Sequence, residues 1–184
     1  MPPVLIGCDA ADFDGTLWSE AVGSYRVQVT LDGTILFFNP AAGRIDRWSV
    51  STWAPLPPIE LGLGAYDIAY SEVLNTLYVG YSNGDITRVQ FDIDLTEDLF
   101  AVLEGSPMGM QVAGAYLVAV DDVGAWESHH VFDMDGALTN SVDWNHPSPE
   151  YIWSEANSRL YFFRDGTSPN DLMWEEIDQG TGLI

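Results

Sequence analysis

The stretch that decides the fold is residues 69–86, AYSEVLNTLYVGYSNGDI. It contains a strand-forming run, a turn, an apolar run, an Asn-Gly pair and the start of another run. Related phrases occur four times, and their apolar runs begin at Ile35, Leu77, Leu117 and Leu160. Successive runs therefore start 42, 40 and 43 residues apart, which indicates a chain built from four related units.

This period predicts an all-β fold, a β-propeller of about four four-stranded blades. Repeats of about 40–45 residues made of short strands are typical of propellers, with one blade to a repeat. The apolar runs are rich in β-branched and aromatic residues and are bounded by Gly, Asn, Asp and Pro, which favours strands over helices. A continuous apolar run also predicts a strand that is buried on both faces.

The four units predict a single domain over residues 1–184, and both of its ends are ragged. Strands are predicted at residues 4–8 and 16–20, before the first full unit, and the last unit ends without a fourth strand. Residues 16–20 could supply that strand and close a four-bladed ring. Alternatively, the blades form an arc of a larger ring or pair with a second chain, and exposed terminal faces would then favour a homo-oligomer.

Residues 68–86 resemble the repeats of YVTN, NHL and YWTD propellers, in which a short strand precedes an apolar strand and a Gly-rich turn. Residues 157–163, NSRLYFF, are similar. The resemblance covers nearly the whole chain, but it lies in structural positions. Because such families include enzymes, receptors and scaffolds, it implies a fold and not an activity.

The charge balance is strongly acidic, with 28 Asp and Glu residues against six Arg and no Lys, a net charge of −22. This argues against binding to nucleic acid or to an anionic membrane, because both require positive charge. Two explanations stay open: an acidic surface suited to a salt-rich environment, or a surface for cations or a basic partner.

No apolar run approaches the roughly eighteen residues that span a bilayer. The first residues carry neither the basic region nor the long apolar region of a signal peptide, so a cytoplasmic location is the default expectation. Cys8 is the only cysteine, which leaves no partner for an internal disulfide.

The first candidate site is the set of loops after the buried strands, because one such loop from each blade gathers around the channel of a propeller. These loops carry short polar or acidic side chains that are predicted to bind a small ligand or a protein: Asn39, Asn83, Asp121, Asp122 and Asp165. No cofactor and no dedicated metal site is predicted, although the carboxylates could hold a hydrated divalent cation.

The seven tryptophans form a second candidate set, because an exposed indole ring can stack on a sugar. Trp53, Trp126 and Trp144 lie near loops and are predicted to contribute to ligand binding. Trp48, Trp153 and Trp174 lie in strand patterns and are predicted to occupy the core between blades.

Arg47, Arg88 and His129 form a third candidate set, since they recur at intervals of 41 residues. Matching places on adjacent blades would align three cations for a carboxylate or sulfated ligand. The alternative is that each pairs with a nearby acid.

The function predicted from these features is a non-catalytic binding or assembly module. One alternative is a metal-dependent hydrolase or lactonase, for which Asp67 and Asp121 are the nearest channel acids. The other is a lectin that uses exposed Trp.

Overall fold

The computed structural model describes residues 26–92, 95–123, 128–143, 147–164 and 171–184. Their strands form four antiparallel sheets in chain order. The first sheet contains β1 (Val27–Val29), β2 (Thr34–Asn39), β3 (Arg44–Ser49) and β4 (Ala54–Glu60), with the 3-10 turn η2 (Pro40–Ala42) between β2 and β3. The second contains β5 (Ala65–Ser71), β6 (Thr76–Tyr81), β7 (Asp85–Gln90) and β8 (Glu97–Val102).

The third sheet contains β9 (Ser106–Ala113), β10 (Tyr116–Asp122), β11 (Ser128–Asp133) and β12 (Leu138–Asp143). The fourth contains β13 (Pro147–Ser154), β14 (Arg159–Arg164) and β15 (Asp171–Glu176). Within each sheet the strands follow one another in chain order, which is the arrangement of a propeller blade. The predicted all-β propeller with four blades is therefore confirmed.

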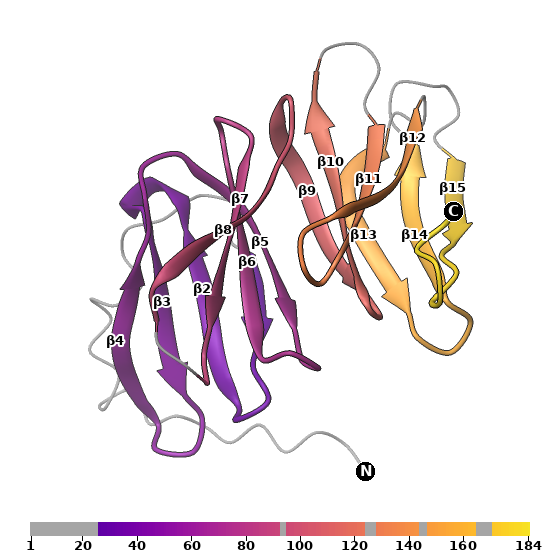
Figure 1. Ribbon diagram of the computed structural model, residues 1–184. Coiled ribbons are helices and arrows are strands. Elements are labelled where there is room, and N and C mark those ends of the chain that lie inside the picture. Colours follow the sequence, from indigo (N-terminus) through magenta and orange to yellow (C-terminus); the bar gives the residue numbers. More distant parts are fainter. Residues whose placement is uncertain (1–25, 93–94, 124–127, 144–146, 165–170) are drawn as a thin grey trace.

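The blades form an arc (Figure 1). Successive first strands lie side by side, β1 against β5, β5 against β9 and β9 against β13. Strands β1 and β13 do not pack together in this way, so the described residues do not close a ring. The arrangement of the described residues is compatible with the predicted arc. The predicted strands at residues 4–8 and 16–20 lie outside the described residues.

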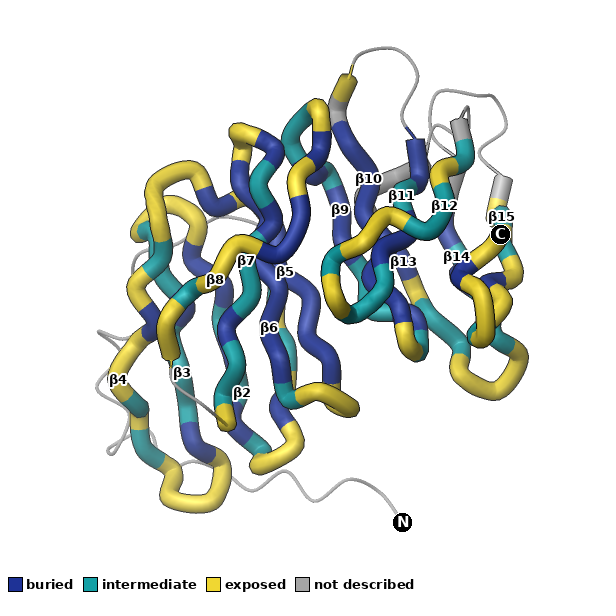
Figure 2. Tube along the Cα trace, viewed as in Figure 1, coloured by how far each residue is buried: buried dark blue, intermediate teal, exposed yellow. Residues whose placement is uncertain are grey.

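Three hydrophobic clusters, one between each pair of neighbouring blades, form the core. The continuous apolar runs of the sequence lie at their centre, and Leu36, Leu77, Tyr78, Leu117 and Leu160 are completely buried. Figure 2 shows the buried residues concentrated along these middle strands and the exposed ones at the turns. Each fully buried Leu contributes ~1.5–3 kcal/mol through the loss of apolar surface, before the entropy of ordering is subtracted.

The turn between β6 and β7 explains why residues 69–86 contain an Asn-Gly pair. Gly84 has a φ of +93°, and a Cβ at this position would clash with the carbonyl oxygen of Leu103. Only glycine combines this backbone conformation with so close an approach. The proline-rich residues 53–58 also behave as predicted, because β4 is the edge strand of the first blade.

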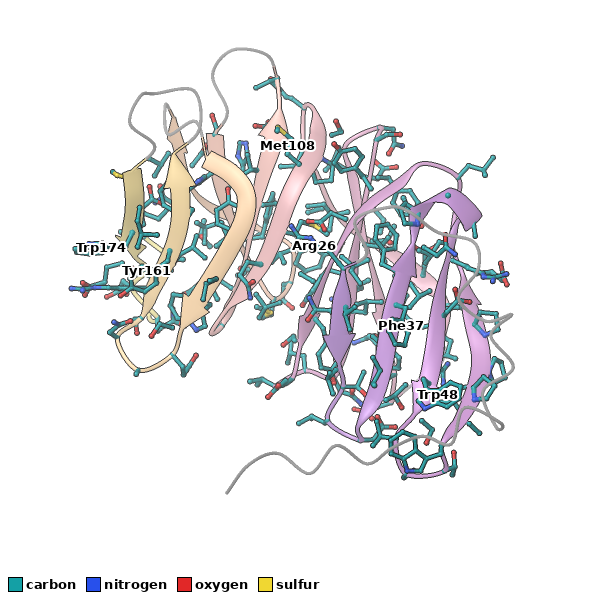
Figure 3. The ribbon with its side chains drawn as sticks, turned by 180° about the vertical axis from the view of Figure 1, so that it is seen from behind. Arg26, Phe37, Trp48, Met108, Tyr161 and Trp174 are labelled. Carbon is teal, nitrogen blue, oxygen red and sulfur yellow. The ribbon has the colours of Figure 1, made fainter. Side chains whose placement is uncertain are left out.

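The tryptophans of the strands differ from one another in burial. Trp153 packs against the core cluster between the third and fourth blades, as predicted. Trp174 was predicted to lie in the core as well, but its side chain is 48% exposed. That prediction is wrong because Trp174 lies on the face of β15 that points away from the other blades (Figure 3).

The described part of the chain contains no helix with the length and apolarity that crossing a bilayer requires.

Candidate functional site

The predicted loop residues Asn39 and Asn83 bind their own turns. Asn39 Oδ1 accepts a hydrogen bond of 3.1 Å from the backbone N–H of Ala42. Asn83 bonds Asp85 twice, through Nδ2 to a carboxylate oxygen at 2.7 Å and through Oδ1 to the backbone N–H at 3.2 Å. Both side chains thus stabilise local backbone, the usual role of Asn in turns. A role in ligand binding stays a prediction.

The other predicted loop residues fall largely outside the description. Asp122 is the last residue of β10, whereas Trp126, Trp144 and Asp165 lie outside the described residues. Their predicted part in ligand binding is therefore untested.

Asp121 lies beside a histidine and a serine on neighbouring strands of the third blade. Its Oδ2 is 3.1 Å from Nε2 of His130, within ion-pairing distance but without hydrogen-bond geometry. The Nδ1 of His130 is in turn 3.2 Å from the hydroxyl of Ser141. The carboxylate is buried and its Oδ1 has no hydrogen-bond partner. None of these residues lines either of the cavities described below.

Asp67, the other predicted channel acid, connects three blades. Its Oδ1 is 2.6 Å from Nε of Arg26, and its Oδ2 accepts a hydrogen bond of 2.6 Å from the backbone N–H of Met110. Arg26 also donates from Nη1 to the carbonyl of Met110 at 3.1 Å. Burial raises the pKa of Asp67 to about 7, although the charge of Arg26 and the backbone donors lower it. Asp67 on β5 thus links the first strand of its blade to Arg26, which precedes β1, and to Met110 on β9.

The predicted column of cations is correct for Arg47 and Arg88 and wrong for His129. Arg47 lies opposite Leu36 and Arg88 lies opposite Tyr78, at matching places in their blades. His129 lies opposite Val120, two positions away from the matching residue, Val131. The connection between β10 and β11 is longer than that between β6 and β7, which shifts the register.

His129 instead joins the third blade to the fourth. It is completely buried, and its Nδ1 is 2.7 Å from Oε2 of Glu175. Its Nε2 is 3.2 Å from the hydroxyl of Tyr151, and its ring packs edge-to-face on Phe162. These contacts make His129 part of an interface between blades.

A small cavity of about 340 Å³ lies between the first and second blades. Arg47 lines it together with Asp32 and Asp92. The Nε and Nη1 of Arg47 have no hydrogen-bond partner, and burial lowers the pKa of this guanidinium while the Asp32 carboxylate opposes that effect. On the second-blade side of this cavity, Asn75 donates a hydrogen bond of 2.7 Å to Asp92. These two polar groups are therefore already paired with each other.

A larger cavity, of about 800 Å³, draws residues from all four blades. It lies where the turns between the first and second strands of the blades meet the first strands. Its lining comprises Gln28, Val29, Tyr70, Ser71, Glu72, Val73, Gln111, Val112, Gly114, Ala115, Trp153, Glu155 and Gln179. We call it the central cavity. A concave site shared by several structural units is the usual location of a ligand.

The charged residues in the lining of the central cavity are both acidic, Glu72 and Glu155. Both are exposed at turns, and Glu155 accepts a hydrogen bond of 2.6 Å from the indole N–H of Trp153. The amide of Gln179 bridges the third and fourth blades, accepting from Ala115 at 3.0 Å and donating to the carbonyl of Ile177 at 3.1 Å. The cavity thus combines aromatic rings, amides and two carboxylates.

The sequence carries a pattern at this cavity that differs from the loop residues predicted above. An aromatic residue, Ser and Glu occur together at Tyr70–Glu72 and again at Trp153–Glu155, in the same turn of two repeats. The sequence predicted the site in the loops after the buried strands. Those loops lie at the other ends of these strands from the central cavity. The repeat of an acidic residue beside an aromatic one would have pointed to the first turn of each blade.

No protein-family model matches the chain, and no curated protein matches it. Solved structures do. A putative 6-phosphogluconolactonase from Bacteroides uniformis has a TM-score of 0.63 at 15% identity over 85% of this chain and 51% of that chain. Virginiamycin B lyase from Staphylococcus aureus has a TM-score of 0.60 at 20% identity over 83% of this chain and 55% of its own.

The β-propeller domain of Swd1 from Myceliophteria thermophila has a TM-score of 0.61 at 14% identity over 80% of this chain and 52% of that chain. The chain thus spans about half the length of each of these proteins. They include a lactonase and a lyase by name, so a likeness at such identities shows the fold alone. The protein has the β-propeller fold, and its described residues form an arc of four blades.

Proposed function

We propose that this protein is a non-catalytic binding module, and that its central cavity takes a cationic ligand, an Arg or Lys side chain of a partner protein. The observation that carries the proposal is the lining of the cavity, whose charged residues are Glu72 and Glu155. A guanidinium or ammonium group would pair with these carboxylates, while Trp153 offers an aromatic face for it.

The charge of the whole molecule supports the same class of partner. A net charge of −22 attracts basic proteins and speeds their association, and it repels acidic ones. The amides of Gln28, Gln111 and Gln179 add neutral donors and acceptors that would fix the orientation of a bound peptide. A binding role requires only these groups, whereas turnover also requires a nucleophile, a base or a metal.

The hydrolase and lectin alternatives receive less support. Asp67 is paired with Arg26, and Asp121 lies outside the central cavity, so neither acid is placed to hold a metal there. Among the described residues, no group of three or more His, Cys, Asp and Glu side chains could hold a metal ion. A sugar could stack on Trp153, but neutral hydroxyl groups would leave the two carboxylates without a charged partner.

Isothermal titration calorimetry with tetra-arginine and with tetra-citrulline tests the proposal, since the second peptide has nearly the same shape without the charge. We expect tetra-arginine to bind at least tenfold more tightly. The double variant Glu72→Gln/Glu155→Gln should weaken tetra-arginine binding about three- to tenfold, because each exposed carboxylate contributes a modest pairing energy. Glu155→Gln keeps an acceptor for the indole of Trp153.

The matched control is Glu60→Gln/Glu104→Gln, which removes the same charge from exposed positions outside the cavity. It should change the affinity less than twofold. Equal losses in the two double variants would mean that the peptide binds the acidic surface as a whole, and equal affinities for both peptides would contradict a cationic ligand. Tight binding of a neutral sugar would favour the lectin.

A further inference from the structure

In the second and third blades, the following blade covers one face of the sheet. The last blade presents the same face, and no described blade follows it. Pairing between strands places Ile152, Tyr161 and Trp174 in one row across β13, β14 and β15. The matching rows are Ala69, Tyr78 and Arg88 in the second blade and Gln111, Val118 and Val131 in the third. Tyr78 and Val118, in the middle of those rows, are completely buried beneath the following blade.

In the last blade the outer members of this row are exposed, and Tyr161 in its middle is partly buried. The side chain of Ile152 is 70% exposed and that of Trp174 is 48% exposed, and Leu172 on the same face is 61% exposed. Figure 3 shows Tyr161 and Trp174 at the outer edge of the molecule, directed away from the other blades. The guanidinium of Arg159 lies 3.8 Å from the centre of the Trp174 ring and covers part of it. We call these residues the trailing face.

The first blade presents the complementary half of the same interface. Val27 and Val29 lie on β1, opposite Phe37 and Ile35 of β2. The residues at matching places in the later blades face the preceding blade and are buried, as Ile68 and Met110 are. Val27 and Val29 are instead 49% and 53% exposed. We call this side of the first blade the leading face.

We propose that the trailing face of one copy packs on the leading face of a second copy, and the reverse, so that two arcs of four blades close one ring of eight. The contact continues an interface that the chain already makes three times, between each pair of neighbouring blades. A second copy supplies both missing halves at once, and a two-fold axis then makes the two junctions equivalent.

The size of known propellers agrees with this assembly. The arc covers 51–55% of three of the solved propellers that it resembles, so two arcs together have about the length of one of these three. The two junctions would bury the exposed Ile, Leu, Trp and Val side chains of both faces, as an interface between obligate partners does. The net charge opposes association, so the dimer should be stronger at moderate salt than at low salt.

Size-exclusion chromatography with multi-angle light scattering on the full chain tests the proposal. We expect twice the chain mass of 20.3 kDa in about 0.3 M NaCl. Ile152→Asp on the trailing face and Val29→Asp on the leading face should each give monomers with unchanged far-UV circular dichroism. The control is Leu63→Asp, a 97% exposed position on neither face, which should stay dimeric.

Mixing the two monomeric variants distinguishes the proposed contact from others. The Ile152→Asp copy keeps an intact leading face and the Val29→Asp copy keeps an intact trailing face, so the mixture should regain one junction and form a dimer. A wild-type monomer at every concentration would overturn the proposal. So would a dimer that Val29→Asp leaves intact, or a ladder of larger species, because the first means a contact between like faces and the second means a ring that does not close.

Discussion

At the scale of single residues, a few buried polar groups join the blades. Asp67 bonds both Arg26 and the backbone of Met110, and His129 bonds Glu175 and Tyr151. Such groups are costly to bury unless they are paired, and removal of one partner leaves the other unsatisfied. The stability of the arc should therefore respond strongly to changes at these positions.

Asp67→Asn should reduce the dependence of stability on pH. The folded-state pKa of about 7 lies above the ordinary value of 3.8, so the folded protein holds a proton that the unfolded chain loses in this range. The contribution of Asp67 to stability is thus complete below about pH 4 and is lost as the pH rises to about 7. Urea unfolding between those pH values should show slopes that differ by up to about 1.4 kcal/mol per pH unit between wild type and variant.

The control for this prediction is Asp32→Asn, because hydrogen bonds from Thr30 and Thr34 lower the pKa of Asp32. That change should leave the slope between pH 4 and 7 as in the wild type. Parallel slopes for wild type and Asp67→Asn would show that Asp67 is ionised throughout the range.

Gly84→Ala should cost about 2–4 kcal/mol of the free energy of unfolding, because the new Cβ meets the backbone of Leu103 at a positive φ. Gly33→Ala is the matched control. Gly33 also has a positive φ, +78°, but nothing lies within 4 Å of its Cβ position, so only about 1 kcal/mol is expected. Urea denaturation measures both. Equal losses would mean that the turn relaxes around the added methyl group.

At the scale of elements, the strands were largely predictable and the contacts between them were not. The apolar runs at Ile35, Leu77, Leu117 and Leu160 all lie within second strands, because burial on both faces leaves a continuous apolar pattern. The proline-rich β4 was equally readable as an edge. The register of His129 was not, since a connection of unequal length shifts one strand against its equivalents.

The central cavity was not predictable from the repeats for a related reason, and it lies at the other end of the blades from the predicted loop site. A repeat pattern shows which residues are equivalent, but it does not show at which turns the first strands of all blades converge. Glu72 and Glu155 lie at equivalent turns, and their convergence on one cavity depends on the angle between blades. That angle arises from packing in the three core clusters, which no single strand encodes.

Glu175→Ala should destabilise the fourth blade against the third by about 1–3 kcal/mol, because it leaves the buried Nδ1 of His129 without its acceptor. The neighbouring residue on β15, Glu176, faces the opposite side, and its side chain is 65% exposed. Glu176→Ala should change the free energy of unfolding by less than about 0.5 kcal/mol. Chemical denaturation compares the two. Equal effects would show that the cross-blade pair adds nothing to stability.

At the scale of the whole molecule, the net charge of −22 should make stability depend on salt. The like charges repel one another in the compact state, and screening by salt relieves that repulsion. We expect the melting temperature to rise between about 0.02 M and 0.3 M NaCl, by about 3 °C for each kcal/mol of repulsion that is relieved. Differential scanning calorimetry measures it. A flat or falling trend would mean that the acids are already paired or widely spaced.

The arc also explains how assembly and binding fit together. The first strands β1, β5, β9 and β13 lie next to one another along the arc, and the central cavity draws on them and on their turns. Two copies joined at their terminal faces would bring two such cavities to one channel. A partner with several basic side chains could then bind both at once.

The most direct test of cation binding in the central cavity is a two-dimensional NMR titration of the indole N–H groups with tetra-arginine. The variants Trp153→Phe and Trp53→Phe assign the two resonances. Trp153 lines the central cavity, whereas Trp53 is 61% exposed in the first blade and lies outside it. If the peptide binds in the central cavity, we expect the Trp153 resonance to shift in a saturable manner and the Trp53 resonance to stay in place. A stationary Trp153 resonance, or equal shifts of both, would contradict a binding site in the central cavity.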